Sequence, residues 1–197
     1  MNTKKLALTI VFAALTVALN PAFTNIMLYA PFAYGLVYQT WEIPIVVAFL
    51  IISPIAGVAI SLLNTAALLA VFPGVLPTGP FYNLAATLSM QTGIYAAHVL
   101  AKRVTKGKTE NPASHFEPKW VAVSTAMGIL SRVTFMSVIL YFALPQQAPV
   151  GFALSVAGTI AYLPFAALFN ATLALYTIPM GYFIARTVSR NLRIDLS

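Results

Sequence analysis

The sequence of 197 residues contains no cysteine and only four acidic residues, and charged residues make up 8% of the chain. Without cysteine, the chain can form neither a disulfide nor a thiolate metal site. Soluble domains carry about 25% charged residues, whereas this chain is 60% hydrophobic, which excludes an ordinary soluble domain. We predict an all-α integral membrane protein with a single domain over residues 1–197 and several crossings of the cell membrane.

Sequence motifs of metal-dependent and ATP-driven enzymes are also missing. There is no His-Glu-x-x-His motif, and the two histidines, His98 and His115, lie in different settings. Residues Lys106–Thr109 match the end of a phosphate-binding loop, but Lys102 stands where the loop needs its first glycine. We therefore expect no enzymatic activity, no metal site and no cofactor. An ATP-driven process would need its ATPase on another subunit.

The eleven basic residues are grouped, and their placement predicts the topology. They lie before the first apolar run, around segment 102–119 and at the C-terminus, while the expected outer loops near 20–34, 73–80 and 145–159 carry no charge. Basic residues near short loops mark the cytoplasmic side of a membrane. Both termini and the loop 102–119 should therefore be cytoplasmic, and the basic clusters are topology signals and not a nucleic-acid patch.

If all three basic clusters lie on the same side of the membrane, the chain must cross the membrane an even number of times between them. The apolar run 43–72 is long enough for two helices and is broken at Ser53-Pro54. The first segment also resembles a signal peptide, but no clear cleavage site follows, which favours an uncleaved helix. We predict six transmembrane helices, at about residues 5–20, 35–53, 55–72, 80–102, 119–144 and 160–188.

Uncharged polar side chains and aromatic rings within these helices and the first outer loop predict a ligand site. They suit a neutral, flat heteroaromatic ligand, because rings stack on its faces and amides pair with its polar edge. The alternative is that the rings form an interfacial belt and the amides join helices. Gathered around one outer cavity they favour binding, and the candidates are Tyr29, Phe32, Tyr34, Asn83, Gln91, Arg132 and Asn170.

Arg132 stands alone inside a long apolar run, in the stretch GILSRVTFM. A charge within the bilayer must face the protein interior or a cavity. Two roles are open for Arg132: a ligand anchor, which we favour, or a structural hub bonded to carbonyl groups or to Glu42. Glu42 is the one candidate for an intramembrane acid, so an ion-coupled carrier is the weaker functional alternative.

Several segments resemble the substrate-binding S components of energy-coupling factor (ECF) transporters, above all the riboflavin-specific type. The segment WEIPIVVAFLIISPIAGVAISLLN resembles their second and third helices. PTGPFYNLAATLSM resembles the opening of their fourth helix, with Asn83, and LPFAALFN resembles the start of their sixth, with Asn170. The chain departs from the riboflavin pattern at Leu173, where a lysine is expected, and at Arg132, where that type tends to carry asparagine.

The resemblance implies an S component that binds riboflavin, or another small vitamin such as thiamine or pantothenate, beneath a gating first loop. The vitamin would be the transported ligand and not a cofactor. The implied partners are a transmembrane coupling subunit and two ATPase subunits, besides membrane lipid. Ala14 and Ala18 form a small-xxx-small pair that permits close helix approach, and the resemblance places them on the face that docks the coupling subunit. A membrane scaffold without a ligand is a third alternative.

Overall fold

The computed structural model describes residues 3–24, 27–32, 36–71, 76–104 and 116–192. Within these residues the protein is built from helices, and the one β-type pairing described is an isolated antiparallel bridge between Tyr29 and Val37. The prediction of an all-α protein is confirmed for this part of the chain. The helices are α1 (Thr3–Ala18), α2 (Pro21–Thr24), α3 (Glu42–Ile51), α4 (Pro54–Val71), α5 (Gly79–Val104), α6 (Pro118–Ala143) and α7 (Val156–Leu192).

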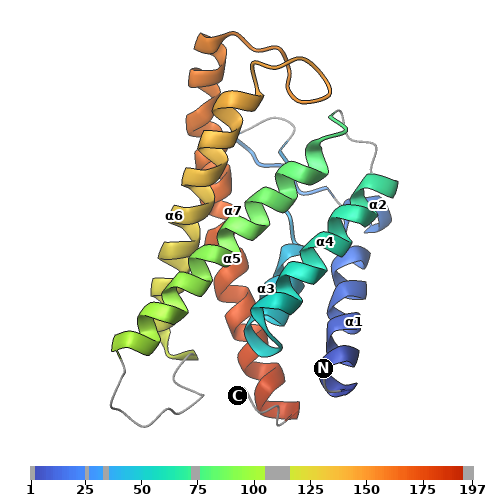
Figure 1. The fold of residues 1–197 in the computed structure, drawn as a ribbon, viewed down its shortest axis with the longest axis vertical. Helices are drawn as coiled ribbons and strands as arrows, with labels where there is room; N and C mark the ends of the chain where they lie inside the picture. Colours follow the sequence, from blue (N-terminus) through green and yellow to red (C-terminus); the bar gives the residue numbers. More distant parts are fainter. Residues whose placement is uncertain (1–2, 25–26, 33–35, 72–75, 105–115, 193–197) are drawn as a thin grey trace.

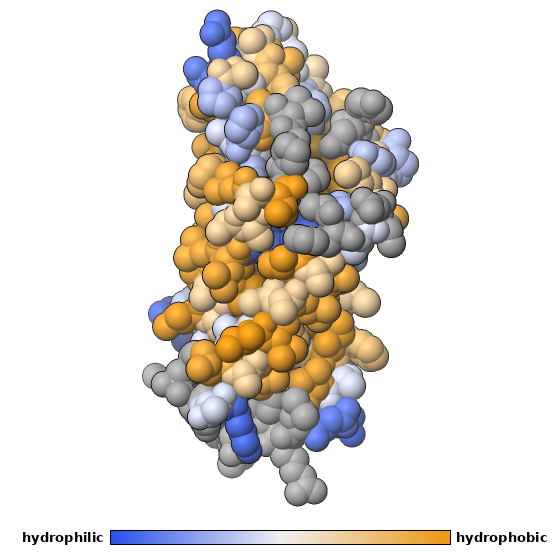
Figure 2. Space-filling model, turned by 90° about the vertical axis from the view of Figure 1, so that its right-hand side faces the viewer, coloured by the Kyte–Doolittle hydropathy of each residue, from blue (hydrophilic) through white to orange (hydrophobic). Residues whose placement is uncertain are grey.

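Three of the described helices, α4, α6 and α7, are long and apolar enough to cross a membrane. Figure 2 shows hydrophobic residues over the middle of one face of the molecule and hydrophilic residues toward both ends. This distribution is compatible with a membrane location. Six crossings and the side of the membrane that each end faces stay predictions.

The helix ends that carry basic residues lie together. Figure 1 shows the start of α1, the end of α5, the start of α6 and the end of α7 at the same end of the molecule. Lys102 and Arg103 lie in the last turn of α5, and Arg190 lies in the last turn of α7. This arrangement is compatible with the prediction that the basic clusters lie on the same side of the membrane.

Helix α3 begins at Glu42 and not near residue 35, so the predicted helix 35–53 is wrong in its first part. The preceding segment pairs with the first loop instead: Ala30 N donates to Leu36 O at 2.8 Å and Tyr38 N donates to Leu28 O at 2.7 Å. These backbone groups form their hydrogen bonds between the two segments and not within a helix. With 10 residues, α3 is about 15 Å long, roughly half of the hydrocarbon core of a bilayer.

The predicted break at Ser53-Pro54 is confirmed. Helix α3 ends at Ile51 and α4 begins at Pro54. Ser53 Oγ accepts a hydrogen bond from Ala56 N at 3.1 Å, as an N-cap residue does. Pro54 then occupies the first helical position, where its missing N–H costs nothing.

Helix α3 lies at the centre of the packing, in contact with α1, α4, α5 and α7. One face joins an apolar cluster that includes Phe12 of α1 and Ile60 of α4. The other joins a cluster with Met90 of α5 and Ile178 of α7. Because its side chains are almost all buried, the first residue of α3, Glu42, is carried into the protein interior.

Helices α5 and α6 approach closely at glycines. A Cβ added at Gly93 would lie 2.4 Å from Met127 O and 2.7 Å from Gly128 Cα, both of which are backbone atoms. Small residues at such crossings let two backbones meet. The close contact fixes the position of α6 beside α5 and therefore the position of Arg132 beside Met90 of α5.

Candidate ligand-binding site

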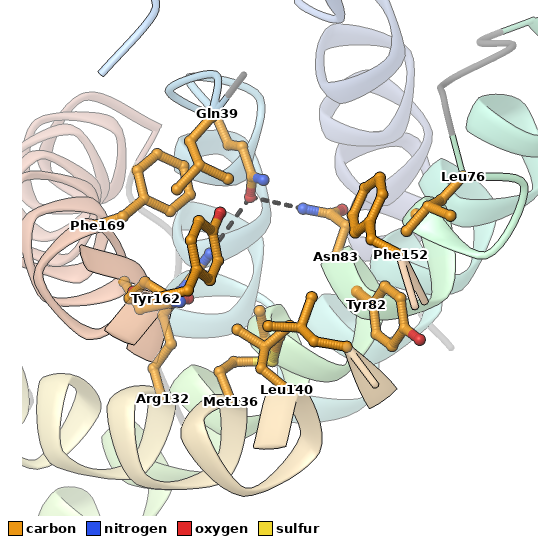
Figure 3. Close-up of a pocket in the computed structure, with 16 residues that line it drawn as sticks. Gln39, Leu76, Tyr82, Asn83, Arg132, Met136, Leu140, Phe152, Tyr162 and Phe169 are labelled. Carbon is orange, nitrogen blue, oxygen red and sulfur yellow. Dashed lines mark hydrogen bonds between the residues drawn. The ribbon is translucent and has the colours of Figure 1, made fainter. Parts of the chain in front are cut away.

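A cavity of about 200 Å³ lies among α5, α6, α7 and the segment before α3. The start of α5, the end of α6 and the start of α7, which contribute to its lining, lie at the end of the molecule opposite the basic helix ends (Figure 1). Figure 3 shows side chains from these elements converging on one space. Its rings are Tyr82, Phe152, Tyr162 and Phe169, and its polar or charged side chains include Gln39, Asn83, Arg132 and Asn170.

A second cavity of about 240 Å³ adjoins the first on the side of Trp41 and Leu68. The two cavities share part of their lining. Gln39 and Asn83 line both of them, and Asn83 Nδ2 donates to Gln39 Oε1 at 2.6 Å. This pair of amides therefore stands between the two spaces.

An ion pair between Arg132 of α6 and Glu42 of α3 lies beside the cavity. Arg132 Nη1 lies 2.5 Å from Glu42 Oε2, and Nη2 lies 3.1 Å from Oε1, so the contact is bidentate. The side chains of Arg132 and Glu42 are 1% and 0% exposed. Removing one partner of such a buried pair leaves an uncompensated charge, at a cost of about 3–5 kcal/mol.

All five N–H groups of the Arg132 guanidinium find acceptors in the protein. Nε donates to Asn170 Oδ1 at 2.9 Å, and Nη2 also donates to Gln39 Oε1 at 3.3 Å. The second Nη1 hydrogen faces Met90 Sδ at 3.7 Å, a weak acceptor. Arg132 thus lines the cavity, and it also has the contact with Glu42 that the structural-hub role predicts.

The Glu42 carboxylate is surrounded by donors. Besides the two contacts with Arg132, its Oε1 accepts from Thr87 Oγ1 at 3.0 Å and from Asn83 Nδ2 at 3.3 Å. Hydrogen bonds to an ionised group are the stronger kind. The centre of the site therefore combines one positive and one negative charge, which balance each other, with neutral amides around them.

The structure brings three of the predicted site residues together, since Asn83, Arg132 and Asn170 line the first cavity. Gln91 lies elsewhere: it is buried in α5 and donates to Ser61 Oγ of α4 at 2.8 Å. Helix α1 carries the predicted docking residues Ala14 and Ala18, both with exposed side chains.

The first-loop candidates lie in different settings. Phe32 packs against the cluster of Ala30, Phe169 and Leu173, and Phe169 is a cavity residue. Tyr29 is exposed, and its hydroxyl donates to Met27 Sδ at 3.0 Å. Tyr34 lies outside the described residues.

Sequence reasoning missed Gln39 and most of the aromatic lining. Gln39 falls within the stretch that we predict as helix, where its amide has no assigned partner. Tyr162 and Phe169 are seven residues apart in α7, which places them on one helix face two turns apart. That spacing, with Asn170 adjacent, is the signal that could have identified them.

The chain matches no protein-family model, no curated protein and no solved structure. The function is therefore inferred from the chemistry of the site itself. Its chemistry is that of a small cavity with aromatic walls, a charge-balanced centre and amides that can pair with a polar ligand edge.

Proposed function

We propose that this protein is the vitamin-binding membrane subunit, or S component, of an ATP-driven importer of the ECF type, with riboflavin as its substrate. The observation that carries the proposal is the combination of aromatic walls with the charge-balanced pair of Arg132 and Glu42 in one cavity. The segments that resemble riboflavin-type S components, with Asn83 and Asn170, support the same assignment.

The balanced charges favour an uncharged substrate. Arg132 and Glu42 are each saturated by protein partners, so a charged ligand would meet no unpaired opposite charge. Moving a charge out of water without such a partner is costly. Among the candidate vitamins, riboflavin is neutral, thiamine is a cation and pantothenate is an anion. The site therefore favours riboflavin over the other two.

The size of the cavity agrees with a ligand that occupies both spaces. Small-molecule sites are typically about 300–1,000 Å³, larger than either the 200 Å³ or the 240 Å³ cavity. Because the two cavities share part of their lining, a ligand seated against the amides of Gln39 and Asn83 would extend into both. The ligand would then lie against Phe169, which also lines both cavities.

The missing ATPase motif fits an importer in which other subunits hydrolyse ATP. The chain would bind the vitamin and dock to a transmembrane coupling subunit, with Ala14 and Ala18 on the docking face, while two ATPase subunits drive transport. The multi-pass chain would reside in the cell membrane with both termini cytoplasmic.

A stand-alone ion-coupled carrier is the second candidate, and the buried carboxylate of Glu42 is the observation that favours it. Intramembrane acids mark proton and ion pathways in carriers. Glu42 is held by Arg132, however, and release of that contact would be needed for each cycle.

Two measurements test the proposal. Calorimetric titration of the purified protein should show riboflavin binding at least about 100-fold tighter than thiamine, pantothenate or flavin mononucleotide binding, since a buried unpaired charge costs several kcal/mol. Uptake of riboflavin by vesicles should require the coupling and ATPase subunits. Uptake by the chain alone under a proton gradient would instead establish the carrier, and absence of binding to any of these compounds would reject a vitamin-binding role.

A further inference from the structure

The ion pair fixes which way two cavity amides point. Gln39 Oε1 accepts hydrogen bonds from Asn83 Nδ2 at 2.6 Å and from Arg132 Nη2 at 3.3 Å. Asn83 Nδ2 donates its second hydrogen to Glu42 Oε1 at 3.3 Å. Each amide thus has one end committed to the charged pair, Gln39 by its oxygen and Asn83 by its nitrogen.

The reversed orientation of either amide is opposed by charge. Turning Gln39 over would set its NH₂ against the guanidinium and against the NH₂ of Asn83, donor against donor. Turning Asn83 over would set its oxygen against the Glu42 carboxylate and the Gln39 oxygen. Like-polarity contacts of this kind in a partly buried site leave hydrogen-bonding groups unsatisfied, so the two charges favour one orientation of each amide.

The opposite ends of the two amides remain available. Within the described residues, Gln39 Nε2 and Asn83 Oδ1 have no hydrogen-bond partner. Figure 3 shows the Gln39 nitrogen apart from the two hydrogen bonds that its oxygen accepts. Both residues line both cavities. One free donor and one free acceptor are therefore available on residues that line both spaces.

We propose that Gln39 and Asn83 form a recognition edge for a neutral ligand with an adjacent C=O and N–H, such as a cyclic amide or imide. Gln39 Nε2 would donate to the ligand carbonyl, and Asn83 Oδ1 would accept from the ligand N–H. Arg132 and Glu42 are positioning residues, which hold the two amides in the required orientation. The inference rests on the proposed function, since riboflavin carries an imide edge on its ring.

The same edge opposes carboxylates and other anions. A carboxylate presents two acceptors, and one of them would face Asn83 Oδ1. A site built to hydrogen-bond an N–H also rejects an analogue that lacks it, because its own buried acceptor is left unpaired. Recognition of the edge is therefore measurable as discrimination between two neutral ligands that differ only in whether the imide nitrogen carries a hydrogen or a methyl group.

Riboflavin and 3-methylriboflavin are such a pair, since methylation replaces the imide N–H by N–CH₃ without adding charge. The parent protein should bind riboflavin at least about tenfold more tightly than the methylated compound, as measured by fluorescence titration. Asn83→Leu should bring this ratio close to one. Glu42→Gln should also lower it, because the neutral amide no longer fixes the orientation of Asn83.

The matched control is Asn64→Leu, which removes a buried amide from a pair outside the recognition edge, where Asn20 Nδ2 donates to Asn64 Oδ1 at 2.7 Å. This variant should keep the discrimination ratio of the parent even where its melting temperature falls. A ratio that fell equally in Asn64→Leu and Asn83→Leu would identify loosened packing as the cause and overturn the inference.

The measurement on the parent protein can by itself overturn the inference. Equal affinity for riboflavin and 3-methylriboflavin would overturn the recognition edge and leave the proposed function intact. Binding of uracil or a neutral pterin over its N-methyl derivative, without riboflavin binding, would support the edge and overturn riboflavin as the substrate. A parent that binds none of these probes would overturn both.

Discussion

Asn170 of α7 accepts a hydrogen bond from Arg132 Nε of α6, with 2.9 Å between Oδ1 and Nε. Asn170 Nδ2 donates in turn to the carbonyl oxygen of Ala166, one helical turn earlier, also at 2.9 Å. Both ends of this amide are engaged within the protein. Asn170 therefore contributes to the cavity by fixing the guanidinium, and the pair joins α6 to α7 beside the site.

Replacement of Arg132 distinguishes its two roles. In Arg132→Gln, the Glu42 carboxylate loses its buried counter-charge, so we expect the free energy of unfolding to fall by about 3–5 kcal/mol. Thermal melting of the ligand-free protein measures this loss. The double variant Arg132→Gln with Glu42→Gln should melt above the single variant, since it leaves no unpaired charge. A ligand anchor alone would instead lower affinity about ten- to a hundred-fold with unchanged melting.

Charge selectivity should depend on Glu42. In Glu42→Gln, Arg132 keeps its charge without a partner, so an anionic ligand gains an unpaired cation in the cavity. We expect the affinity for orotate, a carboxylate of the imide ring, relative to neutral uracil to rise at least about tenfold, by titration of both compounds. The control is Glu117→Gln, because Glu117 pairs with Lys119 at 2.8 Å on an exposed surface and should leave the ratio unchanged. A ratio that does not move in Glu42→Gln would remove the ion pair as the source of selectivity.

Bulky side chains on α1 should block docking. Ala14→Trp with Ala18→Trp should abolish pull-down of the coupling subunit and leave riboflavin affinity at the parent value, since both side chains are exposed and small residues permit close helix contact. Leu130→Trp serves as the control, because Leu130 is an exposed residue of α6. An intact complex with the double variant would exclude α1 as the docking face.

The first loop should slow ligand release through Phe32. This ring packs against the cluster with Phe169, a cavity residue. Phe32→Ala should therefore raise the dissociation rate of riboflavin about tenfold, which stopped-flow fluorescence would detect, because loss of a partly buried, packed ring costs about 1 kcal/mol or more. Leu28→Ala in the same loop changes an exposed side chain and should have the parent rate. Equal dissociation rates in both variants would indicate that the loop only contacts the membrane interface and does not retain the ligand.

Close helix packing should make Gly93 intolerant of any side chain. A Cβ at this position would lie 2.4 Å from Met127 O, whereas one at Gly79 meets nothing within 4 Å. Gly93→Ala should lower the free energy of unfolding by about 1–3 kcal/mol, as overpacking does. Gly79→Ala, at the start of the same helix, should melt within a few degrees of the parent. Thermal melting of both variants checks the difference, and equal stability would contradict the close contact of α5 with α6.

The sequence by itself determined the helical, apolar character of the chain and the break between α3 and α4. Both follow from local chemistry. Apolar side chains are driven out of water, and Ser53-Pro54 ends one helix and caps the next. The isolated charge of Arg132 likewise required partners wherever it lay. Asn83 and Asn170 were found from segments that resemble a family, and the structure places them in one cavity with Arg132.

Only the tertiary structure decided what those residues contact. Arg132 and Glu42 are 90 residues apart in the chain, and their meeting depends on how α3 and α6 are rotated and packed, which no local pattern records. The start of α3 was missed because the segment before it bonds to the first loop and not to itself. For the same reason Gln39 became visible as a site residue only in the folded protein, since its amide oxygen is held by Arg132 of α6 and Asn83 of α5, which are 93 and 44 residues away in the chain.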